Sequence, residues 1–106
     1  MHALPWLAWF GGGATLFNAI PHLVSGLTGR PFQSPFANPP GEGLSSATVN
    51  VLWGFANLAA AYGLLAHVGD FDLRQPADAL ASGLGGLAIS LFAARHFGRF
   101  HGGDLC

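Results

Sequence analysis

The stretch "FQSPFANPPGEGLSS", residues 32–46, is the most polar and proline-rich part of a chain that is otherwise apolar. It separates two long apolar runs, "LPWLAWFGGGATLFNAI" at residues 4–20 and "VNVLWGFANLAAAYGLLAHV" at residues 49–68. Prolines fix the backbone φ angle and bias the residues before them toward extended conformations. We therefore predict that residues 27–45 form an ordered loop between two helices and not a flexible tether.

The composition favours a membrane protein. The 106 residues are 51% hydrophobic and only 8% charged, whereas an ordinary soluble domain has roughly 25% charged residues. A chain this short cannot hide so much apolar surface in a core of its own, so a lipid bilayer is its simplest solvent. The net charge of −1 gives no basic patch for nucleic acid, and we expect no nucleic-acid partner.

Three segments are long and apolar enough for helices that cross a hydrocarbon core, which takes roughly 20 residues. They lie at about residues 4–26, 46–68 and 76–97. Pro76 suits the first turn of the third helix. We predict an all-α integral membrane protein, a single domain of three transmembrane helices in a small bundle, followed by a tail at residues 98–106.

The arginines predict the orientation. The loop at residues 27–45 and the tail lie on one side and contain or adjoin Arg30, Arg95 and Arg99, whereas the opposite side has only Arg74. The positive-inside rule therefore places the loop and the C-terminus in the cytoplasm and the N-terminus outside.

Each predicted helix has a face of small and polar residues, the kind of surface through which helices associate in lipid. The three faces are Gly11, Thr15, Asn18 and His22; Asn50, Gly54, Asn57 and Ala61; and Ala79, Gly83, Gly86, Ser90 and Ala94. We expect these faces to form the contacts of the bundle.

The polar residues concentrate at the level of the loop, because the first helix runs toward the loop and the second runs away from it. An ionisable group inside a membrane is a candidate functional residue, and His22 is the deepest. Serines before the second helix suit an N-cap, and a helix N-terminus attracts anions. The candidate ligand-binding residues are Asn18, His22, Asn50, Trp53, Asn57, Arg95 and Arg99, with Ser45 and Ser46 as cap or anion-binding residues. Alternatively, these residues only hold the bundle together.

The sequence contains no motif of a known catalytic or metal centre. The patterns G-x-S-x-G, G-K-[ST] and H-E-x-x-H do not occur. We assign no catalytic residue, metal or cofactor, and the sequence leans against an enzyme. The similar depth of His22 and His96 leaves a haem-bearing electron-transfer subunit as the least favoured alternative.

The segment F-x-x-P-F-A-x-P-P-G-x-G-x-S-S-x-x-x-N-x-x-W-G, residues 32–54, resembles one that recurs in short, uncharacterised bacterial multi-pass membrane proteins. The resemblance implies a bacterial origin and a constrained loop, and it carries no activity. We expect a multi-pass protein of the bacterial inner membrane. We predict a structural or binding role, as a homo-oligomer or as an accessory subunit of another membrane protein. The alternative is a lipid- or small-molecule-binding or transport protein with a polar site under the loop.

Overall fold

The computed structural model describes residues 3–103. Its elements, in chain order, are α1 (Ala3–Leu27), β1 (Phe32–Gln33), β2 (Leu44–Ser45), α2 (Ala47–Ala66) and α3 (Pro76–His101). The prediction of three helices is confirmed. The third helix continues four residues past its predicted end at 97 and ends before Gly102, whose φ of 77° suits glycine. The part of the predicted tail at residues 104–106 lies outside the described residues.

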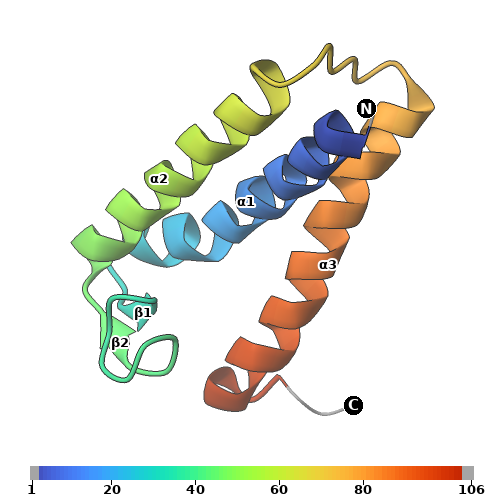
Figure 1. Ribbon diagram of the computed structural model, residues 1–106. Coiled ribbons are helices and arrows are strands. Elements are labelled where there is room, and N and C mark those ends of the chain that lie inside the picture. Colours follow the sequence, from blue (N-terminus) through green and yellow to red (C-terminus); the bar gives the residue numbers. More distant parts are fainter. Residues whose placement is uncertain (1–2, 104–106) are drawn as a thin grey trace.

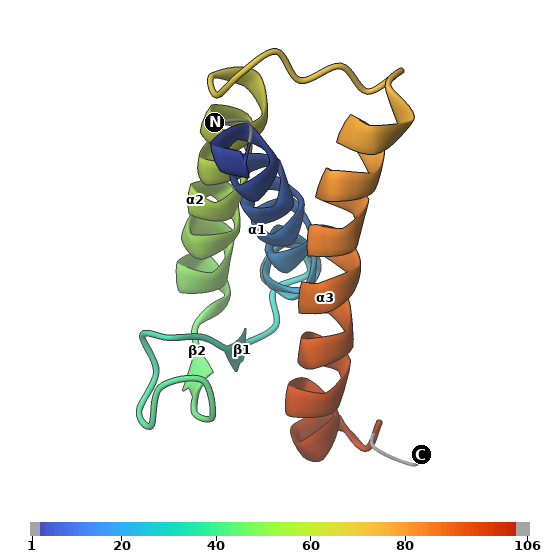
Figure 2. The ribbon, with the colours of Figure 1, turned by 45° about the vertical axis from the view of Figure 1, so that its right-hand side comes forward.

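Helix α1 lies between the other two helices, and α2 and α3 pack on opposite sides of it (Figure 2). The start of α1 and the α2–α3 connection lie at one end of the molecule, and the loop and the end of α3 lie at the other (Figure 1). The loop is closed by an antiparallel ladder in which Phe32 pairs with Ser45 and Gln33 with Leu44. We call this end of the molecule the loop end.

Toward the opposite end, α1 and α3 touch through their backbones. A Cβ atom on Gly13 would lie 1.8 Å from the carbonyl oxygen of Ser82, and one on Gly85 would lie 1.8 Å from that of Phe10. No side chain fits at either position, because real Cβ atoms do not approach a backbone atom so closely. We call these four residues the glycine crossing.

The predicted contact face of α3 is partly wrong. Gly83 belongs to that face, yet a Cβ on it would meet no described atom within 4 Å. Gly86 of the same face is buried as predicted, together with Gly85, which was not part of it. The helix is rotated about its axis from the predicted orientation. Its own small residues lie on several of its faces, and each of these faces allows close approach of another helix. For α2 the predicted face is confirmed, because its buried residues are Asn50, Gly54, Asn57 and Ala61.

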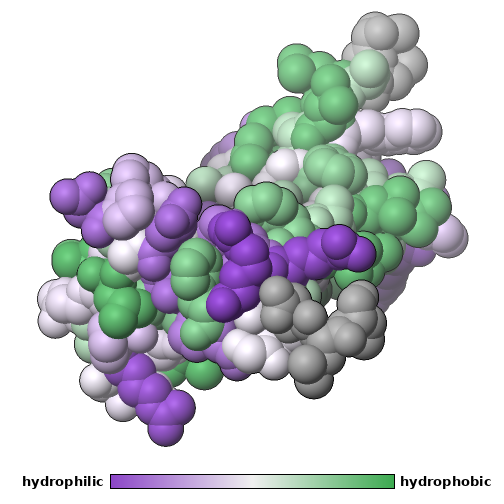
Figure 3. All heavy atoms as spheres, turned by 90° about the horizontal axis from the view of Figure 1, so that it is seen from below, coloured by the Kyte–Doolittle hydropathy of each residue, from purple (hydrophilic) through white to green (hydrophobic). Residues whose placement is uncertain are grey.

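The molecule carries its polar side chains inside and its large apolar side chains outside. The largest fully buried side chains are His22, Asn50 and Ser34, while Leu52 on α2 and Leu91 on α3 are exposed. Both α2 and α3 are long and apolar enough to cross a membrane. Figure 3 looks onto the loop end, where hydrophilic residues gather, with apolar residues over the helices behind them.

Candidate functional site

Asn50 fixes both ends of the loop to the first turn of α2. Its side chain is completely buried. The Nδ2 group donates hydrogen bonds to the carbonyl oxygens of Phe32, Ser45 and Ser46, at 3.1, 3.2 and 3.0 Å. These three acceptors set the orientation of the amide, so that its Oδ1 atom is left to accept a hydrogen bond from elsewhere.

His22 supplies that hydrogen bond. Its Nδ1 atom lies 2.7 Å from Asn50 Oδ1, and only 2% of the residue is exposed. Because an amide oxygen only accepts, the proton of the neutral imidazole is on Nδ1 and the lone pair is on Nε2. The Nε2 atom has no hydrogen-bond partner among residues 3–103. Among residues 3–103, the one fully buried side-chain polar atom without a hydrogen-bond partner is Nε1 of Trp53. Since Nε2 of His22 also lacks a partner but is not such a fully buried atom, it borders open space.

Two further amides connect α1 to α2. Asn18 Nδ2 donates to Asn57 Oδ1 at 3.1 Å, and Asn57 Nδ2 donates to the carbonyl oxygen of Trp53 at 2.9 Å. The carbonyl oxygen of Trp53 can only accept, so Nδ2 of Asn57 donates to it, and Oδ1 of Asn57 accepts from Asn18. Asn18 therefore keeps its Oδ1 atom as an acceptor, with no partner in the described part of the chain.

The loop closes over these residues as a lid, by which we mean residues 34–43. Inside it, the hydroxyl groups of Ser34 and Ser45 lie 2.5 Å apart, and the Gly41 amide donates to the Ser34 carbonyl oxygen at 2.8 Å. On the far side, His96 Nε2 donates to the carbonyl oxygen of Gly41 at 2.7 Å, while His96 Nδ1 accepts from Arg99 at 3.0 Å. The lid is thus connected to α3 through His96, and the residues on either side of it, Phe32 and Ser45, are connected to α2 through Asn50.

Aromatic rings surround His22 on the α3 side of the lid. The ring centroids of Phe32 and Phe97 are 4.7 Å apart, and each meets the imidazole edge to face, at 5.5 and 6.2 Å. His101 stacks on Phe32 at 5.2 Å and its Nε2 donates to Gln33 Oε1 at 2.9 Å. These contacts hold the last turn of α3 against β1, which accounts for the extension of this helix beyond the predicted end.

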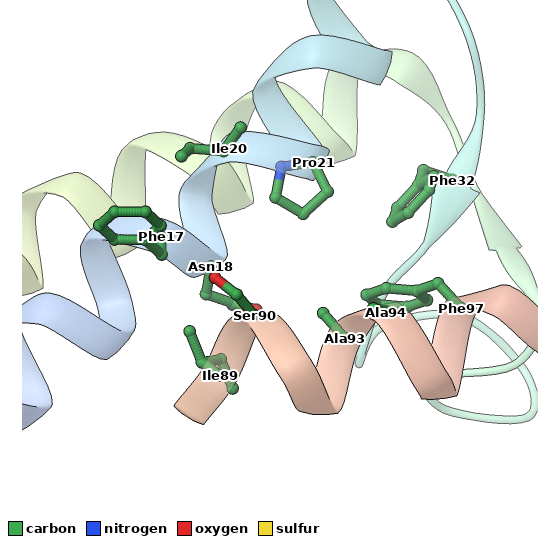
Figure 4. A pocket seen from close by; sticks show the side chains of 10 residues that line it. All are labelled: Phe17, Asn18, Ile20, Pro21, Phe32, Ile89, Ser90, Ala93, Ala94 and Phe97. Carbon is green, nitrogen blue, oxygen red and sulfur yellow. The ribbon is translucent and has the colours of Figure 1, made fainter. Parts of the chain in front are cut away.

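A cavity of about 350 Å³ lies beneath the lid. We call it the lid cavity; it is lined by Asn18, His22, Ser34, Pro35, Pro40, Gly41, Trp53, Phe92, His96 and Phe97. A second cavity of about 320 Å³ shares Asn18 and Phe97 with it. Figure 4 shows this second cavity, with Phe17 and Pro21 of α1 on one side and Ala93 and Phe97 of α3 on the other. Pro21 has no N–H group, so the α1 hydrogen-bond ladder is interrupted beside this cavity.

The structure brings together five of the predicted site residues. Asn18, His22 and Trp53 line the lid cavity, and Asn50 and Asn57 stand behind them as hydrogen-bond partners. The shared depth of these residues on α1 and α2 is what the sequence indicated.

The expected anion site is not assembled. Ser46, and not Ser45, is the N-cap of α2 and accepts from the amide of Val49 at 3.1 Å, while the Ser45 hydroxyl is paired with Ser34. Arg99 binds His96 and lies over the Phe100 ring at 5.1 Å. Arg95 is exposed on α3, which packs on the other side of α1 from α2.

Sequence reasoning missed the roles of Ser34 and His96. Their partners are a second loop serine and a glycine carbonyl oxygen, and a backbone acceptor leaves no signal in the sequence. Both nitrogens of His96 have partners, so a haem iron would have to displace one of them. Across residues 3–103 no three metal-binding side chains gather as a metal site.

No family model, curated protein or solved structure matches this chain.

Proposed function

We propose that this chain is a three-span protein of a bacterial inner membrane that binds a small amphipathic molecule in the lid cavity, with the lid on the cytoplasmic side. The observation that carries the proposal is His22, a buried residue that lines the lid cavity and whose Nε2 atom has no hydrogen-bond partner in the described chain. A residue that only joined helices would have its polar atoms satisfied, because an unpaired buried group costs free energy.

The form of the cavity supports binding. Ligand pockets commonly have volumes of about 300–1,000 Å³, with apolar walls and a few polar groups that orient the ligand. The lid cavity has about 350 Å³, walls of Pro35, Pro40 and Phe97, and polar atoms from Asn18 and His22. A hydrogen bond from α3 holds the lid above it, and one from α2 holds Phe32 beside the lid.

The distribution of side chains supports the membrane setting. Large apolar residues face outward on all three helices, and polar amides and an imidazole are inside. Such an arrangement is unfavourable in water and favourable in hydrocarbon. The basic residues Arg30, Arg95 and Arg99 at the loop end support a cytoplasmic lid.

Native mass spectrometry of the protein from lipid nanodiscs tests the proposal. We expect the wild-type chain to retain a small molecule. Asn18→Phe fills the cavity and removes the hydrogen bond to Asn57, and it should abolish retention. Asn57→Leu removes the same hydrogen bond from a residue that does not line the cavity, and it should retain the molecule. Equal retention by both variants would contradict the proposal.

A structural subunit is the second candidate, favoured by the exposed apolar faces of α2 and α3, which include Phe55 and Leu84. These faces contact either lipid or another membrane protein. The same spectra distinguish the two functions. A single copy with a ligand supports binding, and a ligand-free assembly of several copies supports the structural role.

A further inference from the structure

We propose that the lid cavity recognises a neutral, largely apolar molecule through one hydroxyl group, and that this hydroxyl donates a hydrogen bond to His22 Nε2. The ligand is then an alcohol or a phenol. This inference rests on the proposed binding function and specifies its chemistry.

Two polar atoms of residues that line the cavity are acceptors without a partner among residues 3–103. The three carbonyl oxygens around Asn50 Nδ2 fix the amide, the amide oxygen fixes the proton on His22 Nδ1, and Nε2 is left with its lone pair. Asn18 Oδ1 is an acceptor for a similar reason, since its Nδ2 group donates to Asn57. A ligand must bring a donor to satisfy either atom.

Two donors of the cavity wall are already in use. His96 Nε2 donates to Gly41, and the Gly41 amide donates to Ser34. The indole N–H of Trp53 also lacks a partner among residues 3–103, but it has no accessible surface, so a ligand in the cavity does not reach it. A hydroxyl group brings the donor that His22 Nε2 lacks.

The cavity offers nothing to neutralise a charge. None of its lining residues is an aspartate, glutamate, lysine or arginine. A carboxylate or phosphate would lose its hydration without an ionic partner, at a large free-energy cost. The remainder of the wall consists of flat apolar surfaces from Pro35, Pro40 and Phe97, which suit a ring system or a chain.

The test uses three small probes with the same ring: 1-naphthol, 1-methoxynaphthalene and 1-naphthoate. Equilibrium dialysis against wild-type protein in nanodiscs, with empty nanodiscs subtracted, measures specific binding. We expect 1-naphthol to bind at least about tenfold more tightly than its methyl ether, which keeps the oxygen acceptor but lacks the donor. Naphthoate should not bind above the empty nanodiscs.

Equal affinity for the naphthol and the ether, or preference for naphthoate, would overturn the hydroxyl assignment and leave the binding function standing. No binding of any probe would also overturn it, and a wild-type protein that retains no molecule in the native spectra would overturn the binding function separately. His22→Phe should remove the preference for naphthol, and Thr48→Ala, at an exposed position of α2 outside the cavity lining, should keep it. Because the preference is measured on the wild-type chain, the test does not depend on whether His22→Phe folds.

Discussion

The two ends of the α1–α3 contact are built in opposite ways. At the glycine crossing, backbones touch at Gly13 and Gly85 and no side chain lies between them. At the loop end, the same two helices are separated by side chains such as Asn18 and Phe97, which line two cavities. Close backbone contact fixes the relative position of helices, and side chains with open space between them allow a ligand to enter. We infer that the first end sets the fold and the second end carries the function.

The largest expected effect comes from adding a methyl group at the glycine crossing. Gly85→Ala places a methyl group against the carbonyl oxygen of Phe10, and we expect a loss of about 3 kcal/mol or more in the free energy of unfolding. Gly83→Ala is the matched control, because it adds the same group where no described atom lies within 4 Å; it should be neutral or stabilising by up to about 1 kcal/mol. Thermal unfolding in detergent measures both. Equal melting temperatures for the two variants would contradict the close backbone contact between α1 and α3 at the glycine crossing.

Asn50 should have the next largest effect, because it serves both the loop and His22. Asn50→Leu leaves several buried groups unpaired, each costing about 1–3 kcal/mol, and we expect a total loss of about 3 kcal/mol. Asn57→Leu breaks one interhelical hydrogen bond and should cost about 1 kcal/mol. Unfolding curves of both variants give the order. A smaller loss for Asn50→Leu than for Asn57→Leu would contradict the role of Asn50 as the loop anchor.

Much of this contrast could be predicted from the sequence, and part of it could not. Helical spacing placed Asn18, His22, Asn50 and Asn57 at one level, because depth along a helix follows from residue number. The rotation of α3 about its axis could not be predicted, since glycine, alanine and serine surround that helix and any of several faces permits contact. The lid contacts of Ser34 and His96 could not be predicted from the sequence either, because their partners depend on how the loop folds back.

Substitution of His96 should loosen the lid and leave the glycine crossing unchanged. His96→Phe removes the hydrogen bond to Gly41, with an expected cost of about 1 kcal/mol. Amide hydrogen exchange should become faster in residues 34–43 and stay the same around Gly85. Arg95→Gln, at an exposed neighbouring position of α3, should change neither region. Unchanged exchange in the lid of His96→Phe would show that this contact does not hold it.

The N-cap of α2 should give the smallest effect. Ser46→Ala removes the acceptor for the Val49 amide, and the expected loss is about 1 kcal/mol. Thr48→Ala, at an exposed position of the same turn, should cost less. Urea or thermal unfolding of the pair checks this, and a larger loss for Thr48→Ala would contradict the assignment of the cap.

Photo-cross-linking tests most directly whether the loop end is a binding site. A long-chain alcohol that carries a diazirine is added to the protein in nanodiscs, and the sample is irradiated. Mass spectrometry then identifies the labelled residues. We predict that the label concentrates on Pro35, Trp53 and Phe97, which line the lid cavity, and that 1-naphthol competes it away. Label confined to the outward-facing Leu84 and Leu91, with no competition by 1-naphthol, would contradict the account.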